Sequence, residues 1–121
     1  MKRGFRVAVI GGPRDFRRVL GALPSSARLT SRLTTAMAMI IAFAPRTSAL
    51  ELGFARWKRA LAMNGSLWIC WPKRTSANAS DIDENAVRRC ALAHGLVDVK
   101  VCAIDATWSG LKCVYRLADR T

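Results

Sequence analysis

Several features that would point to a metal site or to a secreted, cross-linked fold are scarce in this sequence. It contains one histidine and four cysteines, Cys70, Cys90, Cys102 and Cys113, which are widely spaced and form no C-x-x-C pair. Because zinc is bound by ligands that cluster in such short motifs, no metal site is predicted. The cysteines are expected to be reduced thiols, mostly buried in the core.

Long hydrophobic stretches and a secretion signal are also missing. The longest apolar run extends from Ala36 to Ala44, well below the roughly 18 residues that a membrane-spanning helix needs. The basic start Met1–Arg3 resembles the beginning of a signal peptide, but Arg6 and Arg14 interrupt the apolar stretch and no small-residue cleavage site follows. We therefore expect a cytoplasmic protein with no membrane segment.

Acidic residues are few. The chain has 8 Asp and Glu against 20 Lys and Arg, which gives a net charge of +12. The excess lies in residues 1–60, where the only acids are Asp15 and Glu51. A basic half favours attraction to nucleic acid, acidic lipid or an acidic protein. Most of the bases are single, scattered arginines, however, which is equally typical of an arginine-biased proteome, so nucleic-acid binding is kept as an alternative.

The chain does have enough apolar residues for one ordered domain. It is 121 residues long and 51% hydrophobic, and a domain of this size buries roughly two-thirds of its unfolded surface. We predict a single domain over residues 1–121. Periodicity predicts strands at Arg6–Ile10, Ala27–Leu33, Ala36–Phe43, Ser66–Trp71, Leu96–Ile104 and Leu111–Leu117, and helices at Arg14–Leu20, Thr47–Ala62 and Asp81–His94.

These elements predict a Rossmann-like α/β fold. Helix-linked strands imply a mostly parallel open sheet with helices on both faces, in three layers, closed by a C-terminal antiparallel hairpin. The polar strand Ala27–Leu33 is expected at an edge. The apolar strand Ala36–Phe43 is expected to be buried on both faces.

Helix ends carry recognisable signals. Gly65 is predicted to stop the second helix in a left-handed conformation, and Gly95 the third. Ser80 is predicted to cap the third helix, with the acids Asp81, Asp83 and Glu84 in its first turn, where the helix dipole favours negative charge. The single histidine, His94, is interpreted as a capping residue at the other end of that helix.

The C-terminal hairpin has a regular alternation. Val97, Val99, Val101 and Ala103 are predicted on one side of the fifth strand, with Asp98 and Lys100 on the other. If the hairpin is centred between Thr107 and Trp108, Cys102 and Cys113 face each other across the two strands, and whether they oxidise is left open.

Candidate ligand-binding residues follow three strand ends, because ligands of open α/β sheets bind beyond the carboxyl ends of the strands. The first segment holds Gly11, Gly12 and Arg14, where helix N–H groups and a cation suit a phosphate. The full G-x-G-x-x-G is absent, and Leu33 is followed by Thr34 and Thr35 in place of a ribose-binding acid. A tight strand-to-helix turn is therefore the alternative interpretation.

The second and third segments hold Lys73 and Arg74 beside Trp71, and Trp108 with Asp105 in the last turn. Two cations beside two aromatics could hold a phosphate, a carboxylate or a stacked base. The alternative is a solvated loop in which the tryptophans cover the end of the core. Asp105 suits a general base or a hydroxyl-binding group, although a turn-forming aspartate is equally consistent.

Long strings in the second half resemble a bacterial family known as domain of unknown function 3052. They are G-S-L-W-I-C-W-P-K at Gly65–Lys73, H-G-L-V-D-V-K-V-C-A-I-D at His94–Asp105 and W-S-G-L-K at Trp108–Lys112. The resemblance is looser over Arg6–Pro13, and it adds no activity. It implies a trimmed methyltransferase-type Rossmann fold with strand order 2-1-3-4-6-5, and fold alone does not give function.

Three functions remain. The first is a non-catalytic ligand-binding or regulatory module that binds an anionic small molecule or a protein partner, with no cofactor. The second is a degenerate S-adenosylmethionine (SAM)-dependent methyltransferase. The third is a basic nucleic-acid-binding protein, which would bind through the arginines of the first half. The oligomeric state is left open.

Overall fold

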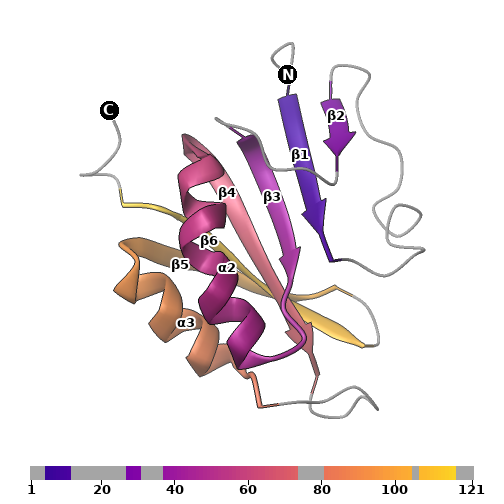
Figure 1. The fold of residues 1–121 in the computed structure, drawn as a ribbon, viewed down its shortest axis with the longest axis vertical. Helices are drawn as coiled ribbons and strands as arrows, with labels where there is room; N and C mark the ends of the chain where they lie inside the picture. The colour runs from indigo at the N-terminus through magenta and orange to yellow at the C-terminus, as the bar shows by residue number, and fades with distance from the viewer. Residues whose placement is uncertain (1–4, 12–26, 31–36, 74–80, 105–106, 117–121) are drawn as a thin grey trace.

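The computed structural model describes residues 5–11, 27–30, 37–73, 81–104 and 107–116. Within these ranges one 6-stranded sheet has the order β2-β1-β3-β4-β6-β5 (Figure 1). The elements are β1 Phe5–Ile10, β2 Ala27–Thr30, β3 Met37–Phe43, α2 Thr47–Ala60, β4 Leu61–Pro72, α3 Glu84–Ala93, β5 Leu96–Ala103 and β6 Trp108–Tyr115. The first four strands pair in parallel, whereas β6 is antiparallel to both β4 and β5. The predicted fold class, strand order and edge position of β2 are confirmed.

Helices α2 and α3 lie on the same face of the sheet, which we call the helix-covered face (Figure 1). The apolar stripe of α2, with Leu50, Phe54 and Trp57 spaced by three or four residues, packs there against side chains of β3, β4 and β6. The opposite face of the sheet carries a smaller cluster of Val7, Ile41, Phe43 and Cys70. The helix predicted at Arg14–Leu20 lies outside the described residues.

The boundary between α2 and β4 differs from the prediction. The helix ends at Ala60, and Leu61 already begins a strand. Gly65 is a strand residue without a left-handed conformation, because positive φ angles occur among the described glycines only at Gly11 and Gly95. A Cβ on Gly65 would lie 2.8 Å from the carbonyl oxygen of Met37 and 2.9 Å from that of Ala38. The glycine is needed for the close approach of β3 and β4, and not to end a helix.

The N-termini of α2 and α3 are each capped by an aspartate. Asp83, not Ser80, caps α3, and its Oδ1 accepts a hydrogen bond from Ala86 N at 2.8 Å. Asp81 caps α2 from a distant part of the chain, since its Oδ1 accepts from Thr47 N at 2.9 Å. That hydrogen bond holds the pKa of the Asp81 carboxyl below its ordinary value. Ser80 lies outside the described residues.

The C-terminal end of α3 agrees with the prediction. His94 is the C-cap residue, and its backbone N–H donates to carbonyls of the last turn. Gly95 follows with φ +83°. Lys58 Nζ of α2 donates to the His94 carbonyl, and Tyr115 Oη of β6 donates to the Lys58 carbonyl at 3.0 Å. These contacts hold the C-terminal ends of α2 and α3 against β6.

The register of the hairpin differs from the prediction. Asp98 pairs with Cys113 but Lys100 pairs with Lys112, so Val99 is an extra residue in a β-bulge. The predicted alternation is therefore interrupted, and Val99 and Val101 are 60% and 43% exposed at the sheet edge. Cys102 pairs with Gly110 and does not face Cys113, because the turn is centred earlier than predicted. All four cysteines are free thiols.

Among the described residues, neither α2 nor α3 is long and apolar enough to cross a membrane.

Candidate functional site

The carboxyl ends of β1, β3 and β4 lie together at one end of the sheet, and we call this row of strand ends the rim (Figure 1). Gly11 follows β1 with φ +70°, and a Cβ there would lie 3.3 Å from the Phe43 carbonyl oxygen at the end of β3. The end of β3 is joined to β4 by a 2.8 Å hydrogen bond from Ala44 N to the Cys70 carbonyl. The glycine allows the chain to turn sharply away from β1 directly beside β3.

The start of β6 completes the rim. Pro72 pairs with Trp108, and Lys73 N donates to the Thr107 carbonyl at 2.7 Å. The Trp108 ring meets the Phe43 ring edge to face, with centroids 4.9 Å apart. Gly11, Lys73 and Trp108 therefore share one edge, as the strand order requires.

Four of the predicted ligand-binding residues, Gly12, Arg14, Arg74 and Asp105, lie outside the described residues. Gly11, Trp71, Lys73 and Trp108 lie at the rim, and their role in binding stays a prediction.

The two rim tryptophans lie on different faces of the sheet. Trp71 packs in the core under α2 and α3 and is 6% exposed, whereas Trp108 packs with Phe43 on the opposite face. The register explains this, because Trp108 pairs with Pro72 and neighbouring residues of a strand point to alternate faces. The two indoles do not flank one ligand, and Trp71 covers the end of the core.

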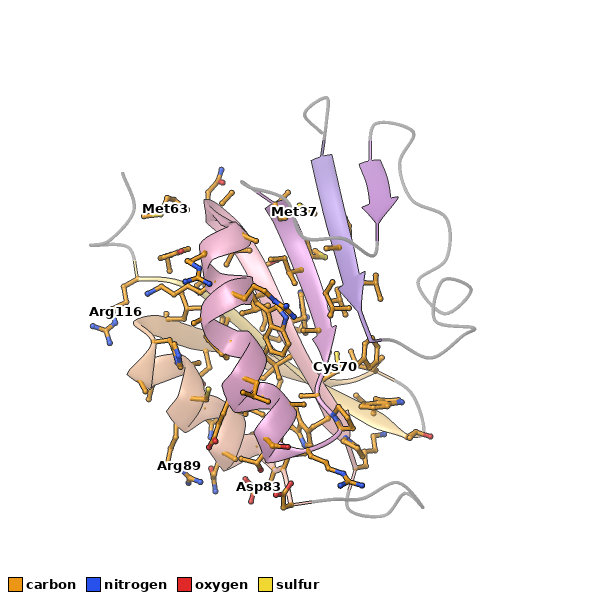
Figure 2. The ribbon with its side chains drawn as sticks, viewed as in Figure 1. Met37, Met63, Cys70, Asp83, Arg89 and Arg116 are labelled. Atoms are coloured by element: carbon orange, nitrogen blue, oxygen red, sulfur yellow. The ribbon has the colours of Figure 1, made fainter. Side chains whose placement is uncertain are left out.

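A pocket of about 390 Å³ opens at the rim on the helix-covered face. One of its lining residues, Asp83 at the start of α3, is labelled at the lower end of the molecule in Figure 2. Its lining combines β4, the first turn of α3 and β6: Trp71, Lys73, Asp83, Glu84, Asn85 and Ser109. A volume of this size suits a small molecule.

Of the six residues that line this pocket, sequence reasoning proposed only Trp71 and Lys73 as ligand-binding residues. It treated Asp83 and Glu84 as helix-start charges only and did not single out Asn85 or Ser109. The signal was available, because a helix that follows β4 must start at the rim where β4 ends. Glu84 accepts a hydrogen bond from Arg88 at 2.6 Å, and this pairing raises the pKa of the guanidinium.

A second pocket, of about 350 Å³, lies between α2 and α3 and includes Cys90, His94 and Glu51. His94 Nδ1 lies 2.8 Å from the Cys90 carbonyl oxygen, which fixes the ring. Burial, and then the nearby Glu51 carboxylate, raise the pKa of the Cys90 thiol. The thiol is therefore protonated at neutral pH, which makes it a poor nucleophile and a poor metal ligand.

No protein-family model matches the chain, and no curated protein matches it by sequence. Solved structures do match. A TehB-like SAM-dependent methyltransferase from Corynebacterium glutamicum has a TM-score of 0.60 at 13% identity, over 96% of this chain and 83% of that one. Magnesium protoporphyrin IX methyltransferase from Synechocystis, with bound SAH, has a TM-score of 0.63 at 11% identity, over 94% and 75%.

A putative type 11 methyltransferase from Sulfolobus solfataricus matches with a TM-score of 0.58 at 13% identity, over 98% of this chain and 87% of that one. These matches correct the prediction of a non-catalytic ligand-binding or regulatory module and favour the methyltransferase alternative. The open mixed sheet, with its antiparallel β6 between β4 and β5, is the fold of the SAM-dependent methyltransferases.

Proposed function

We propose that the chain binds SAM at the rim and belongs functionally with the methyltransferases. The observation that carries the proposal is the fold, a sheet with strand order β2-β1-β3-β4-β6-β5, which matches solved structures of that class over most of both chains. In open α/β sheets the ligand lies where the strand order reverses, which in this chain is between β1 and β3.

The end of β1 meets one requirement of a SAM site. A nucleoside that lies against a strand end needs a backbone without a side chain in its way. Gly11 meets this need, since its left-handed φ strains any residue with a Cβ, and a Cβ would lie in tight contact, 3.3 Å, with the Phe43 carbonyl oxygen. Gly11 and the adjoining end of β3 would hold the cofactor, which supplies an activated methyl group when bound.

One expected group is missing. A ribose-binding carboxylate would stand after β2, which ends at Thr30 and not at Leu33 as predicted, and the sequence has no Asp or Glu over residues 27–36. A hydrogen bond to a charged group contributes about 1.5–3 kcal/mol. We therefore expect SAM to bind about ten- to a hundredfold more weakly than at a site with that carboxylate.

The rim pocket is the proposed place of the methyl acceptor. Its lining joins one cation, Lys73, to the carboxylates of Asp83 and Glu84. Such a lining favours a small acceptor that carries groups of both charges and disfavours a polyanion. Lys73 would bind an anionic group of the acceptor, and the neighbouring backbone of β4 and β6 would orient it.

The finer family assignment is also a proposal. The strings that resemble domain of unknown function 3052 fall on β4 and on the hairpin of β5 and β6, and two of them end or begin at the rim. Relatives that carry the same W-P-K and W-S-G strings are expected to share this strand order. The anionic small molecule or protein partner expected from the sequence stays a prediction.

Calorimetry with SAM and two glycine variants tests the proposed function. Gly11→Ala and Gly95→Ala both place a Cβ at a left-handed glycine, with φ of +70° and +83°, but only Gly11 is at the rim. Each change strains the backbone by about 1–2 kcal/mol, so both should lower the melting temperature similarly. Gly11→Ala is expected to weaken SAM binding at least tenfold, while Gly95→Ala binds as the wild type does. A wild type that shows no binding at millimolar SAM, or a Gly11→Ala variant with unchanged affinity, would overturn the proposal.

A further inference from the structure

Because of the β-bulge at Val99, the oppositely charged side chains of Asp98 and Lys100 lie on opposite faces of the sheet. Asp98 pairs with Cys113, which is buried under the helices, and accepts a 3.0 Å hydrogen bond from Arg88 of α3. Lys100 pairs with Lys112, whose neighbours Leu111 and Cys113 are both in the core under the helices. Because side chains alternate along a strand, Lys112 and Lys100 point to the opposite face. In a regular strand, Asp98 and Lys100 would have shared one face.

Trp68 extends this pair into a row of three. It pairs with Lys112 across β4 and β6, and it packs with the cluster on the opposite face. Trp68, Lys112 and Lys100 therefore lie side by side on three neighbouring strands, about 4.8 Å apart from one strand to the next. We call these three residues the cationic row. Lys100 is exposed, and Lys112 and Trp68 are partly exposed.

The Trp68 indole lies along the sheet surface toward the rim. Its Cε3 would be 3.4 Å from a Cβ on Gly110, and Ile104 covers the same glycine. Gly110 thus leaves room for the indole to lie down on the sheet beside the two lysines.

Carboxylates are absent from this face in the described part of the chain. Asp81 and Asp83 cap α2 and α3, and Asp98 contacts Arg88. Glu51 and Glu84 line the two pockets on the helix-covered face. No ion pair of the described residues involves Lys100 or Lys112. Two like charges directly opposite one another destabilise a sheet, so a bound anion would relieve the repulsion between Lys100 and Lys112.

We propose that the cationic row binds single-stranded nucleic acid, with a base stacked on Trp68 and successive phosphates on Lys112 and Lys100. An aromatic side chain in line with cations on an open sheet is how single strands are bound without sequence preference. The chain's net charge of +12 adds long-range attraction to a polyanion. This surface is on the other side of the sheet from the rim pocket, so the inference is independent of SAM binding.

Fluorescence anisotropy with labelled oligothymidylate of about 12 nucleotides tests the inference on the full chain. The variant Lys100→Gln/Lys112→Gln removes the two cations of the row. The matched control, Arg56→Gln/Arg59→Gln, removes the same charge from two exposed positions of α2 on the helix-covered side. The row variant is expected to bind at least tenfold more weakly, whereas the control changes affinity less than about threefold.

Salt titration gives a second measure for the same variants. Each phosphate contact of a single strand contributes about 0.7 to the slope of log affinity against log salt, so the row variant should lose about 1.4. Its melting temperature should not fall, because removing a like-charged cross-strand pair relieves repulsion. Equal loss of affinity in the row and control variants would overturn the inference.

The stacking part is tested at Trp68. An abasic strand with the same number of phosphates should bind at least about fivefold more weakly to the wild type, since it has no base to stack on the aromatic ring. Trp68→Leu should remove this difference and Trp68→Phe should restore part of it. If the abasic strand and heparin bind as tightly as oligothymidylate, the row is a general polyanion surface and the nucleic-acid assignment is wrong.

Discussion

At the scale of single residues, burial decides which thiols can react. Cys70 and Cys113 are fully buried, on opposite faces of the sheet. Burial, with smaller contributions from Asp98 and Cys90, raises the pKa of Cys113 to about 12. A neutral thiol of this kind behaves as a small apolar side chain of the core. Cys90 and Cys102 are only partly buried, and the spacing of the cysteines along the chain does not distinguish them from the two buried thiols.

Cys113 should therefore make stability depend on alkaline pH. Its folded pKa of about 12 lies above the ordinary value of 9.0, so its contribution is fully present below pH 9 and is lost as the pH rises toward 12. At about pH 10 the loss is about 1.4 kcal/mol. Urea denaturation of the wild type and of Cys113→Ala measures it. The loss between neutral and alkaline pH should be smaller in the variant, and identical losses would contradict the assignment.

At the scale of strands and helices, most elements could be predicted from periodicity, but their ends could not. The apolar spacing of α2 and the apolar run of β3 were sufficient signals for type and position. The end of α2 was misplaced because Asn64–Gly65 has the composition of a helix stop, although contact with β3 is what requires the glycine. The cap on α2 comes from Asp81, 34 residues after Thr47, and no local pattern predicts it.

Because β3 and β4 approach each other closely at Gly65, a side chain at this position is expected to lower the free energy of unfolding. Gly65→Ala would push a methyl group to within 3 Å of two carbonyl oxygens of β3, and overpacking of this kind costs about 1–3 kcal/mol. Thermal or urea unfolding measures the loss. Asn64→Ala is the matched control, because its exposed neighbouring position should tolerate the change. A Gly65→Ala variant as stable as the control would show that β3 and β4 can separate locally without cost.

At the scale of the whole molecule, strand order could be predicted, but the division of charge between the two faces could not. Alternation along β5 predicted Asp98 and Lys100 on one side, because a single extra residue in a strand leaves no mark in the sequence. The rim was predictable from topology, but four of the six residues that line its pocket were missed, three of them because α3 was treated apart from β4. The methyltransferase-type strand order was predicted through the strings that resemble domain of unknown function 3052, and the complete sheet and its structural matches support that fold.

The extra residue at Val99 also has a consequence for solubility. β5 is an edge strand with exposed valines, and such an edge is a template for pairing between chains. Bulges twist an edge away from flat strand addition, and an outward lysine adds to the protection. Deletion of Val99 would leave a regular, valine-rich edge, and sedimentation should then show more concentration-dependent self-association than in the wild type or in Val99→Ala, which keeps the bulge. If the deletion variant associates no more than the wild type and Val99→Ala do, the bulge does not protect the edge. If it associates more, the one additional valine in β5 is what prevents two molecules from pairing their sheets edge to edge.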